Sequence, residues 1–170
     1  MNPWPDLRPI LKGIQWALIG GVATRAYMAE RMTKDMDILI RHEDENIVLE
    51  RLRQASYKTE SPLAIGGWVV RSPEDIEIDV LLGHQVWLQT ALDHPHLDPA
   101  GYPVIDLPYL VLMKMESSRS LDIGDLGRLL GLASDQDLDR VRQAVNQYSP
   151  QDVQDLESLI YLGKLELGQN

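Results

Sequence analysis

The sequence of 170 residues contains no cysteine, which excludes disulfide bonds and thiolate metal sites. It also lacks any apolar run near the roughly 20 residues that a membrane-spanning helix needs, so we expect no membrane association. Residues 1–5 have neither the basic start nor the apolar core of a signal peptide. A cytoplasmic location is therefore expected.

Basic residues are too few to balance the acidic ones. The chain has 16 Lys and Arg against 26 Asp and Glu, a formal net charge of -10. Because bulk DNA or RNA binding needs a basic surface that displaces counterions, we expect no such binding. A small anionic substrate that arrives with Mg²⁺ is compatible with this charge, since the metal and a few local cations reverse the field inside a cleft.

Strand-like segments occupy the first part of the chain and helix-like segments the last part. The expected strands cover residues 15–19, 35–40, 68–71 and 76–82. The expected helices cover residues 6–11, 22–30, 42–54, 108–117, 122–132, 135–147 and 149–162. We therefore predict an α/β (α+β) fold, with a mixed-sheet core over residues 1–106 and a helical C-terminal region over residues 107–170 packed on the core.

Residues 17–40 carry the clearest chemical pattern. An apolar strand ends in Gly20-Gly21, and a second strand opens with Asp35-Met36-Asp37. Side chains alternate along a strand, so Asp35 and Asp37 lie on one face, where they repel each other unless a cation lies between them. Paired glycines let a phosphate approach the backbone at the start of the following helix. This combination indicates phosphoryl or nucleotidyl transfer.

A third acid is expected from a neighbouring strand if the pair binds two metals. Residues 76–81 alternate, placing Glu77 and Asp79 on one face. Asp79 precedes three apolar residues and so lies deeper in the apolar run, where an unpaired acid is costly. We take Asp79 as the third acid and Glu77 as the alternative.

Taken together, these features resemble the polymerase-beta-type nucleotidyltransferase superfamily. Residues 31–37, Arg-Met-Thr-Lys-Asp-Met-Asp, are similar to the Arg-x-Thr-x-Asp-x-Asp of small bacterial nucleotidyltransferases, including those of toxin–antitoxin and phage-abortive systems. Residues 107–125 resemble the helical segment that follows the catalytic core in that group. Many members of the superfamily have Ser at the position of Gly21, and the substitution of Gly for this Ser occurs widely in the small bacterial groups.

The resemblance implies transfer of a nucleoside monophosphate from a nucleoside triphosphate to a protein, tRNA or small-molecule acceptor. Asp35, Asp37 and Asp79 would be catalytic and would hold two Mg²⁺ ions. The turn at Gly20 and Gly21 would cradle the triphosphate. Further candidate nucleotide ligands are Thr33 and Lys114. Since the glycine pair ends one strand and the Asp pair begins the next, the two strands must run antiparallel to meet one triphosphate.

Less specific interpretations stay open for several of these residues. Thr33 is alternatively a helix cap, and Lys114 a snorkelling surface lysine. Arg119 with Asp122 and Asp125 favours structural ion pairs over substrate contact. At the level of function, one rival is a catalytically inactive module that acts as antitoxin or partner of a helical toxin, and another is metal-dependent phosphodiester hydrolysis. The sequence leaves open the nucleotide, the acceptor and the oligomeric state.

Overall fold

The computed structural model describes residues 4–29, 32–117 and 120–168. The chain forms two compact units, one of residues 1–23 and 31–105 and the other of residues 24–30 and 106–170. Residues 24–30 therefore group with the C-terminal helices, although in the chain they lie between two strands of the first unit. None of the helices in the described part combines the length and apolar composition that a membrane span requires.

The first unit is built on a seven-stranded sheet with short helices. Its strands are β1 (Trp16–Ile19), β2 (Asp35–Arg41), β3 (Lys58–Pro62), β4 (Gly67–Arg71), β5 (Glu77–Gly83), β6 (His96–Leu97) and β7 (Pro103–Val104). Its helices are α1 (Gly20–Ala23), the 3₁₀ turn η2 (His42–Asp44), α2 (Glu45–Gln54) and α3 (Leu88–Asp93).

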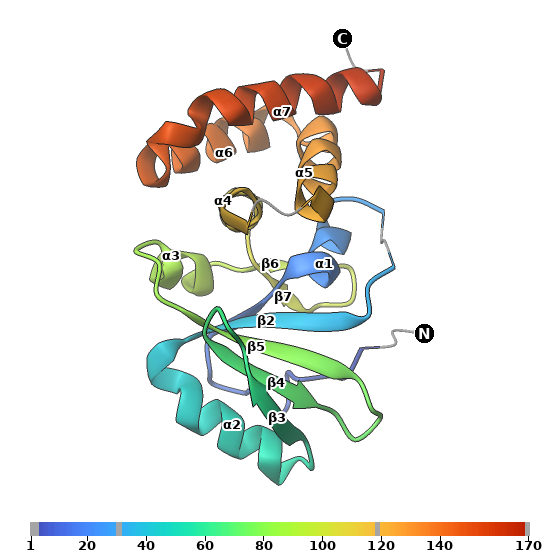
Figure 1. The fold of residues 1–170 in the computed structure, drawn as a ribbon, viewed down its shortest axis with the longest axis vertical. Coiled ribbons are helices and arrows are strands. Elements are labelled where there is room, and N and C mark those ends of the chain that lie inside the picture. Colours follow the sequence, from blue (N-terminus) through green and yellow to red (C-terminus); the bar gives the residue numbers. More distant parts are fainter. Residues whose placement is uncertain (1–3, 30–31, 118–119, 169–170) are drawn as a thin grey trace. The chain divides into compact units, whose positions relative to one another are not determined.

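The sheet is mixed, as predicted. Its strand order is β3-β4-β5-β2-β1-β7-β6, and Figure 1 shows β2, β5, β4 and β3 side by side. β1 pairs antiparallel with β2, which confirms the orientation predicted from the glycine and aspartate pairs. β5 runs parallel to β2 on its other side. Two strands that each carry acidic residues are thus direct neighbours.

Alternation of side chains explains why β2 forms where it does. Met36 and Ile38 are fully buried, whereas Asp35 and Asp37 on the opposite face are half-buried. The next hairpin, β4–β5, is closed by a turn in which the Ser72 hydroxyl accepts hydrogen bonds from the backbone N–H groups of residues 74 (3.2 Å) and 76 (3.1 Å). These two local patterns fix the strands that carry the acids.

Several expected elements differ from those observed. The helix expected over residues 22–30 is only α1 followed by the 3₁₀ turn η1 (Thr24–Ala26), because residues from 24 onward leave the first unit and join the second. In place of the helix expected over residues 6–11, residues 8–13 form a turn, with one helical hydrogen bond from the N–H of Leu11 to the carbonyl of Leu7 (2.8 Å). The two-residue strands β6 and β7 lie between residues 83 and 107, where no strand was predicted.

The second unit consists of the predicted C-terminal helices together with η1. They are α4 (Leu107–Ser117), α5 (Ser120–Leu132), α6 (Asp135–Tyr148), the 3₁₀ turn η3 (Pro150–Asp152) and α7 (Val153–Glu166). α6 begins after Ser134, whose hydroxyl accepts a hydrogen bond from the backbone N–H of Asp137 (3.1 Å), as expected of a capping residue.

Glycines allow α5 and α7 to pack closely against each other. A Cβ atom at Gly163 of α7 would lie 2.1 Å from the carbonyl oxygen of Gly127 of α5. A Cβ atom at Gly131 would lie 2.5 Å from the carbonyl oxygen of Gly163. Side chains larger than hydrogen would therefore force the two helix backbones apart at this crossing.

Candidate active site

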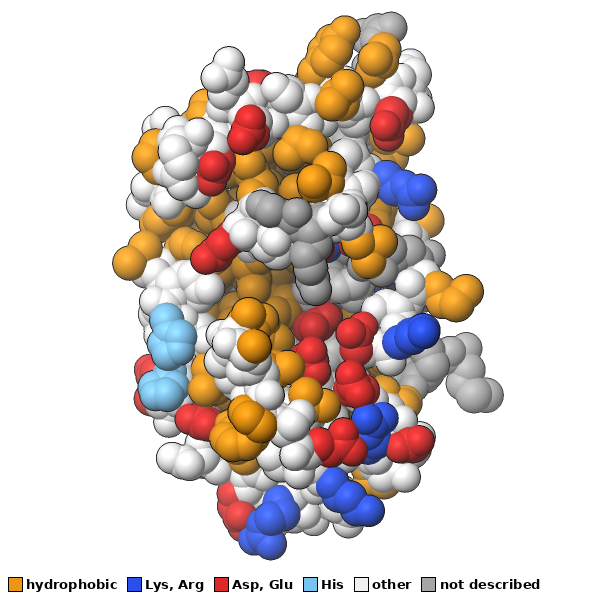
Figure 2. Space-filling view, viewed as in Figure 1, with side chains coloured by type: hydrophobic (Ala, Val, Ile, Leu, Met, Phe, Trp, Pro, Cys, Tyr) orange, Lys and Arg blue, Asp and Glu red, His pale blue; other side chains and the backbone are white. Residues whose placement is uncertain are grey.

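Three carboxylates meet where β2 and β5 run side by side. Asp37 of β2 lies opposite Asp79 of β5 in the parallel register, two positions along from the pair formed by Asp35 and Glu77. One oxygen from each of Asp35, Asp37 and Asp79 lies within 4.8 Å of the other two. Figure 2 shows acidic side chains gathered over these strands. The structure thus brings together the three acids that the sequence singled out.

Gly20, at the end of β1, lies directly against the Asp37 carboxylate. Its φ of +63° falls in the left-handed region that favours glycine. A Cβ atom at this position would lie 2.0 Å from Asp37 Oδ2, far inside van der Waals contact. Gly20 therefore provides the space in which the carboxylate sits, in addition to allowing the turn into α1.

Asp79 carries the least favourably placed charge of the group. Its Oδ1 atom is buried and has no hydrogen-bond partner within the described residues. Burial, followed by repulsion from Asp35 and Glu77, raises the pKa of the Asp79 carboxyl above its usual value. Hard divalent cations prefer carboxylate oxygens as ligands. The unpaired Asp79 oxygen and the two neighbouring carboxylates together offer such a set. These three residues therefore fit a metal site.

Glu77, the alternative third acid, is engaged elsewhere. It accepts a hydrogen bond from Arg71 Nη2 at 2.8 Å, and the same guanidinium pairs with Glu60 at 2.9 Å. Among the residues that the structure describes, the group of Asp35, Asp37 and Asp79 is the one that could hold a metal ion with three ligands. Glu77 contributes to the local negative charge and is neutralised by Arg71.

Thr33 lies next to the acids rather than apart from them. Its hydroxyl donates a hydrogen bond to Asp35 Oδ1 at 2.8 Å. This bond fixes the orientation of the Asp35 carboxylate and leaves its second oxygen for another partner. The role of Thr33 as a nucleotide ligand stays a prediction, but its contact with Asp35 is one that the sequence did not indicate.

Lys114, on α4, belongs to the second unit. Its ammonium donates to Asp122 Oδ1 and to Asp125 Oδ2, both at 2.8 Å, and the side chain is only 3% exposed. The sequence favoured ion pairs of Asp122 and Asp125 with Arg119, which lies outside the described residues. In the structure both acids pair with Lys114. A contact between Lys114 and a phosphate stays a prediction.

The close approach of Gly20 to Asp37 is the main feature that sequence reasoning missed. The signal was available in the antiparallel pairing of β1 and β2, whose register places Ile19 opposite Asp37. That register brings the residue after Ile19 to the base of the Asp37 side chain. The sequence analysis explained Gly20 only as a residue that lets a phosphate approach the backbone, and so it did not predict the contact with Asp37.

Comparisons with known proteins give the fold. A scan against protein-family models and a search of curated proteins both find no match. The solution structure of the antibiotic-resistance factor ANT(2'')-Ia is similar over 95% of this chain and 91% of its own, with 11% identity and a TM-score of 0.53. Its crystal structure in complex with adenylyl-2''-tobramycin matches over 91% and 92%, with 14% identity and a TM-score of 0.50.

A third structure, the lincosamide antibiotic adenylyltransferase LnuA bound to lincomycin, has 14% identity over 82% of this chain and 90% of its own, with a TM-score of 0.45. At such identities the likeness to ANT(2'')-Ia shows the fold alone. The protein has a nucleotidyltransferase fold with a mixed sheet and a helical C-terminal half, as the sequence predicted.

Proposed function

We propose that this protein is a Mg²⁺-dependent nucleotidyltransferase that moves a nucleoside monophosphate from a nucleoside triphosphate to an acceptor. The observation that carries the proposal is the group of three carboxylates, with oxygens within 4.8 Å of one another, on adjacent strands of a nucleotidyltransferase fold. The glycine turn lies against the same group. A metal-binding group and a backbone turn suited to phosphate therefore occupy one place in the first unit.

In this proposal Asp35, Asp37 and Asp79 hold two Mg²⁺ ions, which neutralise charge on the reacting phosphates when bound. Asp79, whose buried Oδ1 has no hydrogen-bond donor among the described residues, takes the proton from the acceptor hydroxyl. The acceptor oxygen forms a bond to the α-phosphorus, the bond to the β-phosphate oxygen breaks, and pyrophosphate leaves with the electron pair. Thr33 holds Asp35 in place during this reaction.

The remaining site residues are assigned to the triphosphate. Gly20 and Gly21 approach the phosphates through backbone N–H groups, because neither has a side chain to keep them away. The helix α1, which begins with these two glycines, is only four residues long, so the backbone itself rather than a helix dipole must supply the attraction. Thr33 completes the proposed nucleotide ligands of the first unit, and a contact of Lys114 with a phosphate stays a separate prediction.

The acceptor is proposed as a protein, a tRNA or a small molecule such as an aminoglycoside. One of the similar structures, ANT(2'')-Ia, is in complex with adenylyl-2''-tobramycin, an adenylylated antibiotic, which supports the small-molecule class. A toxin–antitoxin setting in the cytoplasm is part of the same proposal. A small helical protein encoded by the neighbouring reading frame would support it.

The proposal is tested by incubating the protein with Mg²⁺, a cell lysate and each labelled nucleoside triphosphate in turn. Label is expected on protein, RNA or a small molecule, with release of pyrophosphate. Asp35→Asn and Asp37→Asn should abolish transfer and leave the fold intact, because removing like-charge repulsion rarely destabilises. Glu74→Gln, which removes an exposed acid from the β4–β5 turn, is the matched control and should stay active.

Calorimetry tests the metal dependence of nucleotide binding directly. Binding of ATP or CTP should strengthen when Mg²⁺ is added to the wild type, and should not respond to Mg²⁺ in either Asn variant. Equal nucleotide binding with and without metal would contradict the proposal. Binding of a helical partner without any binding of a nucleotide would instead fit the inactive antitoxin-like module. The intact set of three acids argues against that alternative.

A further inference from the structure

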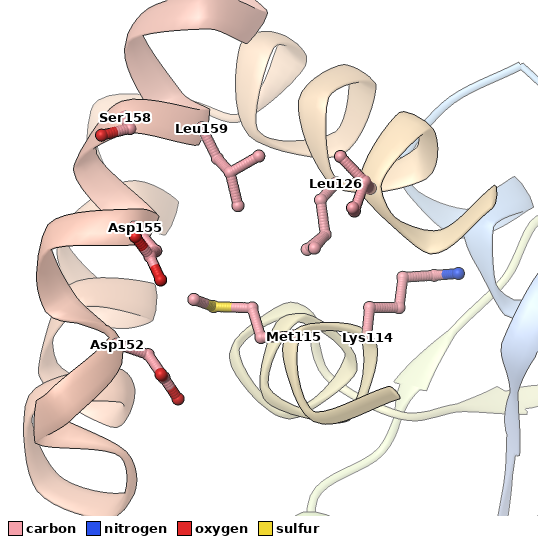
Figure 3. A pocket seen from close by; sticks show the side chains of 8 residues that line it. Lys114, Met115, Leu126, Asp152, Asp155, Ser158 and Leu159 are labelled. Atoms are coloured by element: carbon pink, nitrogen blue, oxygen red, sulfur yellow. The ribbon is translucent and has the colours of Figure 1, made fainter. Parts of the chain in front are cut away.

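The second unit contains an open pocket that the proposed reaction does not use. It lies between α4, α5 and the η3–α7 segment and has a volume of about 330 Å³. Figure 3 shows side chains from these helices directed into it. Sites for small molecules have volumes of roughly 300–1,000 Å³, so this pocket can hold a small ligand or part of a larger one.

Each of the three helices contributes apolar side chains to the pocket. Met115 of α4, Leu126 of α5 and Leu159 of α7 point toward one another across it (Figure 3), and Ile123 of α5 also lines it. Ile123 is 50% exposed. Covering such surface by a ligand's apolar part removes it from water, which favours binding.

The η3–α7 wall of the pocket also carries acidic side chains. Asp152, the last residue of η3, and Asp155, in the first turn of α7, are directed toward the interior (Figure 3). Within the part of the chain that the structure describes, Asp155 has no hydrogen-bond or ion-pair partner. Asp152 Oδ2 accepts hydrogen bonds from Ser149 Oγ (2.7 Å) and Gln151 Nε2 (3.2 Å), and its other oxygen accepts none from the described residues. Both carboxylates therefore have free acceptor capacity.

The lysine that borders the pocket does not neutralise these acids. The Lys114 ammonium is directed away from the pocket in Figure 3 and pairs with Asp122 and Asp125. Only the apolar stem of Lys114 borders the cavity. The pocket consequently carries two negative charges beside an apolar surface, and no cation among the described lining residues is paired with either charge.

We propose that this pocket binds a small organic ammonium ion, with its apolar body against Met115, Leu126 and Leu159 and its charge beside Asp152 and Asp155. A bare metal ion fits less well, because the apolar side chains offer it no ligands and the described residues form a three-ligand group only at Asp35, Asp37 and Asp79. The net charge of -10 raises the local concentration of cations. The proposal stands whether or not the first unit catalyses nucleotidyl transfer.

The test compares 2-phenylethylammonium with its neutral analogue 2-phenylethanol on the full chain. Binding is followed by NMR through the methyl group of Met115, assigned with a Met115→Leu variant. The ammonium probe should shift this signal saturably, and the alcohol should bind more weakly. Asp155→Asn should weaken binding of the ammonium probe by about twofold to fivefold, the range for an exposed charge pair, and leave the alcohol unaffected.

Two further variants of α7 make the result specific. Glu166→Gln removes a negative charge from the same helix about 16 Å further along, at about 1.5 Å per residue, and should leave both probes unchanged. Ser158→Lys places a cation one turn from Asp155 and should block the ammonium probe. The proposal is overturned if the Met115 signal does not respond, if the alcohol binds as well as the ammonium, or if Glu166→Gln and Asp155→Asn have the same effect.

Discussion

At the scale of single residues, the fit between Gly20 and Asp37 determines whether the acidic group can form. The Cβ of any larger residue at position 20 would occupy the place of Asp37 Oδ2. The same residue also adopts a left-handed backbone conformation. Two separate costs, backbone strain and a collision with the carboxylate, therefore apply to a substitution here.

Gly20→Ala should abolish metal-dependent nucleotide binding, because Asp37 must turn away from Asp35 and Asp79. Gly13→Ala is the matched control, since Gly13 has a φ of +80° but open space where its Cβ would lie. The control should lose only about 1–2 kcal/mol of stability from backbone strain and keep nucleotide affinity. Calorimetric titration of both variants with Mg²⁺ and ATP measures the difference. Retained affinity in Gly20→Ala would contradict the proposed role of Asp37.

The raised pKa of Asp79 predicts a stability that depends on pH. In the folded protein Asp79 keeps its proton to a higher pH than in the unfolded chain, where the value is near 3.8. The free energy of unfolding therefore falls as the pH rises from that value through the folded pKa, and it stays lower above it. The metal-free protein is thus destabilised at neutral pH by the carboxylate that the proposed reaction needs.

Asp79→Asn should accordingly melt at a higher temperature than the wild type at pH 7 without divalent metal. The difference should vanish as the pH approaches the unfolded value. Added Mg²⁺ should raise the melting temperature of the wild type and not of the variant, because ligands stabilise the state that binds them. Scanning calorimetry across pH, with EDTA or Mg²⁺, provides the comparison. A variant less stable than the wild type at pH 7 would show that Asp79 is stabilised by contacts other than metal.

The ion pairs of Lys114 predict a large loss of stability on substitution. Lys114→Met leaves Asp122 and Asp125 buried without their shared cation, which typically costs about 3–5 kcal/mol. The sequence alone predicts that loss of this lysine weakens triphosphate binding without lowering stability; the structure leads us to expect a lower melting temperature. Nucleotide affinity, measured on the same variant, tests the predicted phosphate contact separately.

Lys164→Met serves as the control for that variant. Lys164 pairs with the exposed Asp135 at 3.3 Å in the same unit, so its loss should change stability by only about 0–1 kcal/mol. Thermal unfolding of both variants gives the comparison. If both variants lose equally little stability, the buried ion pairs of Lys114 contribute no more to the free energy of unfolding than a surface ion pair does.

At the scale of elements, the crossing of α5 and α7 depends on glycine backbones in contact. Gly163→Ala should destabilise the second unit, because its methyl group meets the Gly127 carbonyl and the helices must separate. Gly124→Ala, elsewhere on α5 with open space around it, should instead stabilise by about 0.5–1 kcal/mol, as alanine does within a helix. Urea unfolding curves of the two variants should therefore shift in opposite directions.

Alternation of apolar residues was sufficient to predict β2 and β5, since each turns alternate apolar side chains into the core. It did not predict β3, whose residues Lys58–Pro62 are all exposed and show no alternation. β3 forms because its backbone pairs with β4 at the edge of the sheet and because Glu60 pairs with Arg71. Contacts of this kind join residues that are separated in the sequence, so a local pattern does not reveal them.

The same limit applies to the candidate site. The three acids were predictable because each lies on a strand whose alternation fixes its face. The space that Gly20 leaves for Asp37 and the hydrogen bond from Thr33 depend on how strands and turns meet in three dimensions. The pocket between α4, α5 and the η3–α7 segment is likewise formed by residues that are separated in the sequence, so the pattern of one segment does not reveal it.

At the scale of the whole molecule, the chain passes between its two units three times. It leaves the first unit after Ala23, returns at residue 31 and leaves again after Ile105. Tyr27, in the segment between the first two passages, is half-buried in the second unit, where burial raises the pKa of its hydroxyl and the backbone of Leu107 lies within hydrogen-bonding reach. Residues 24–30 thus belong structurally to helices that begin about eighty residues later in the chain.

No single cut can therefore separate the two units into intact fragments. A fragment ending at residue 105 would carry residues 24–30 away from the helices that they group with, and would leave Tyr27 without the backbone of Leu107. The complementary fragment, residues 106–170, would keep the pocket but lack a segment of its own unit. Residues 24–30, which group with the C-terminal helices, lie in the chain between β1 with its glycine turn and β2 with two of the acids. We therefore expect loss of the C-terminal helices to affect both of these strands.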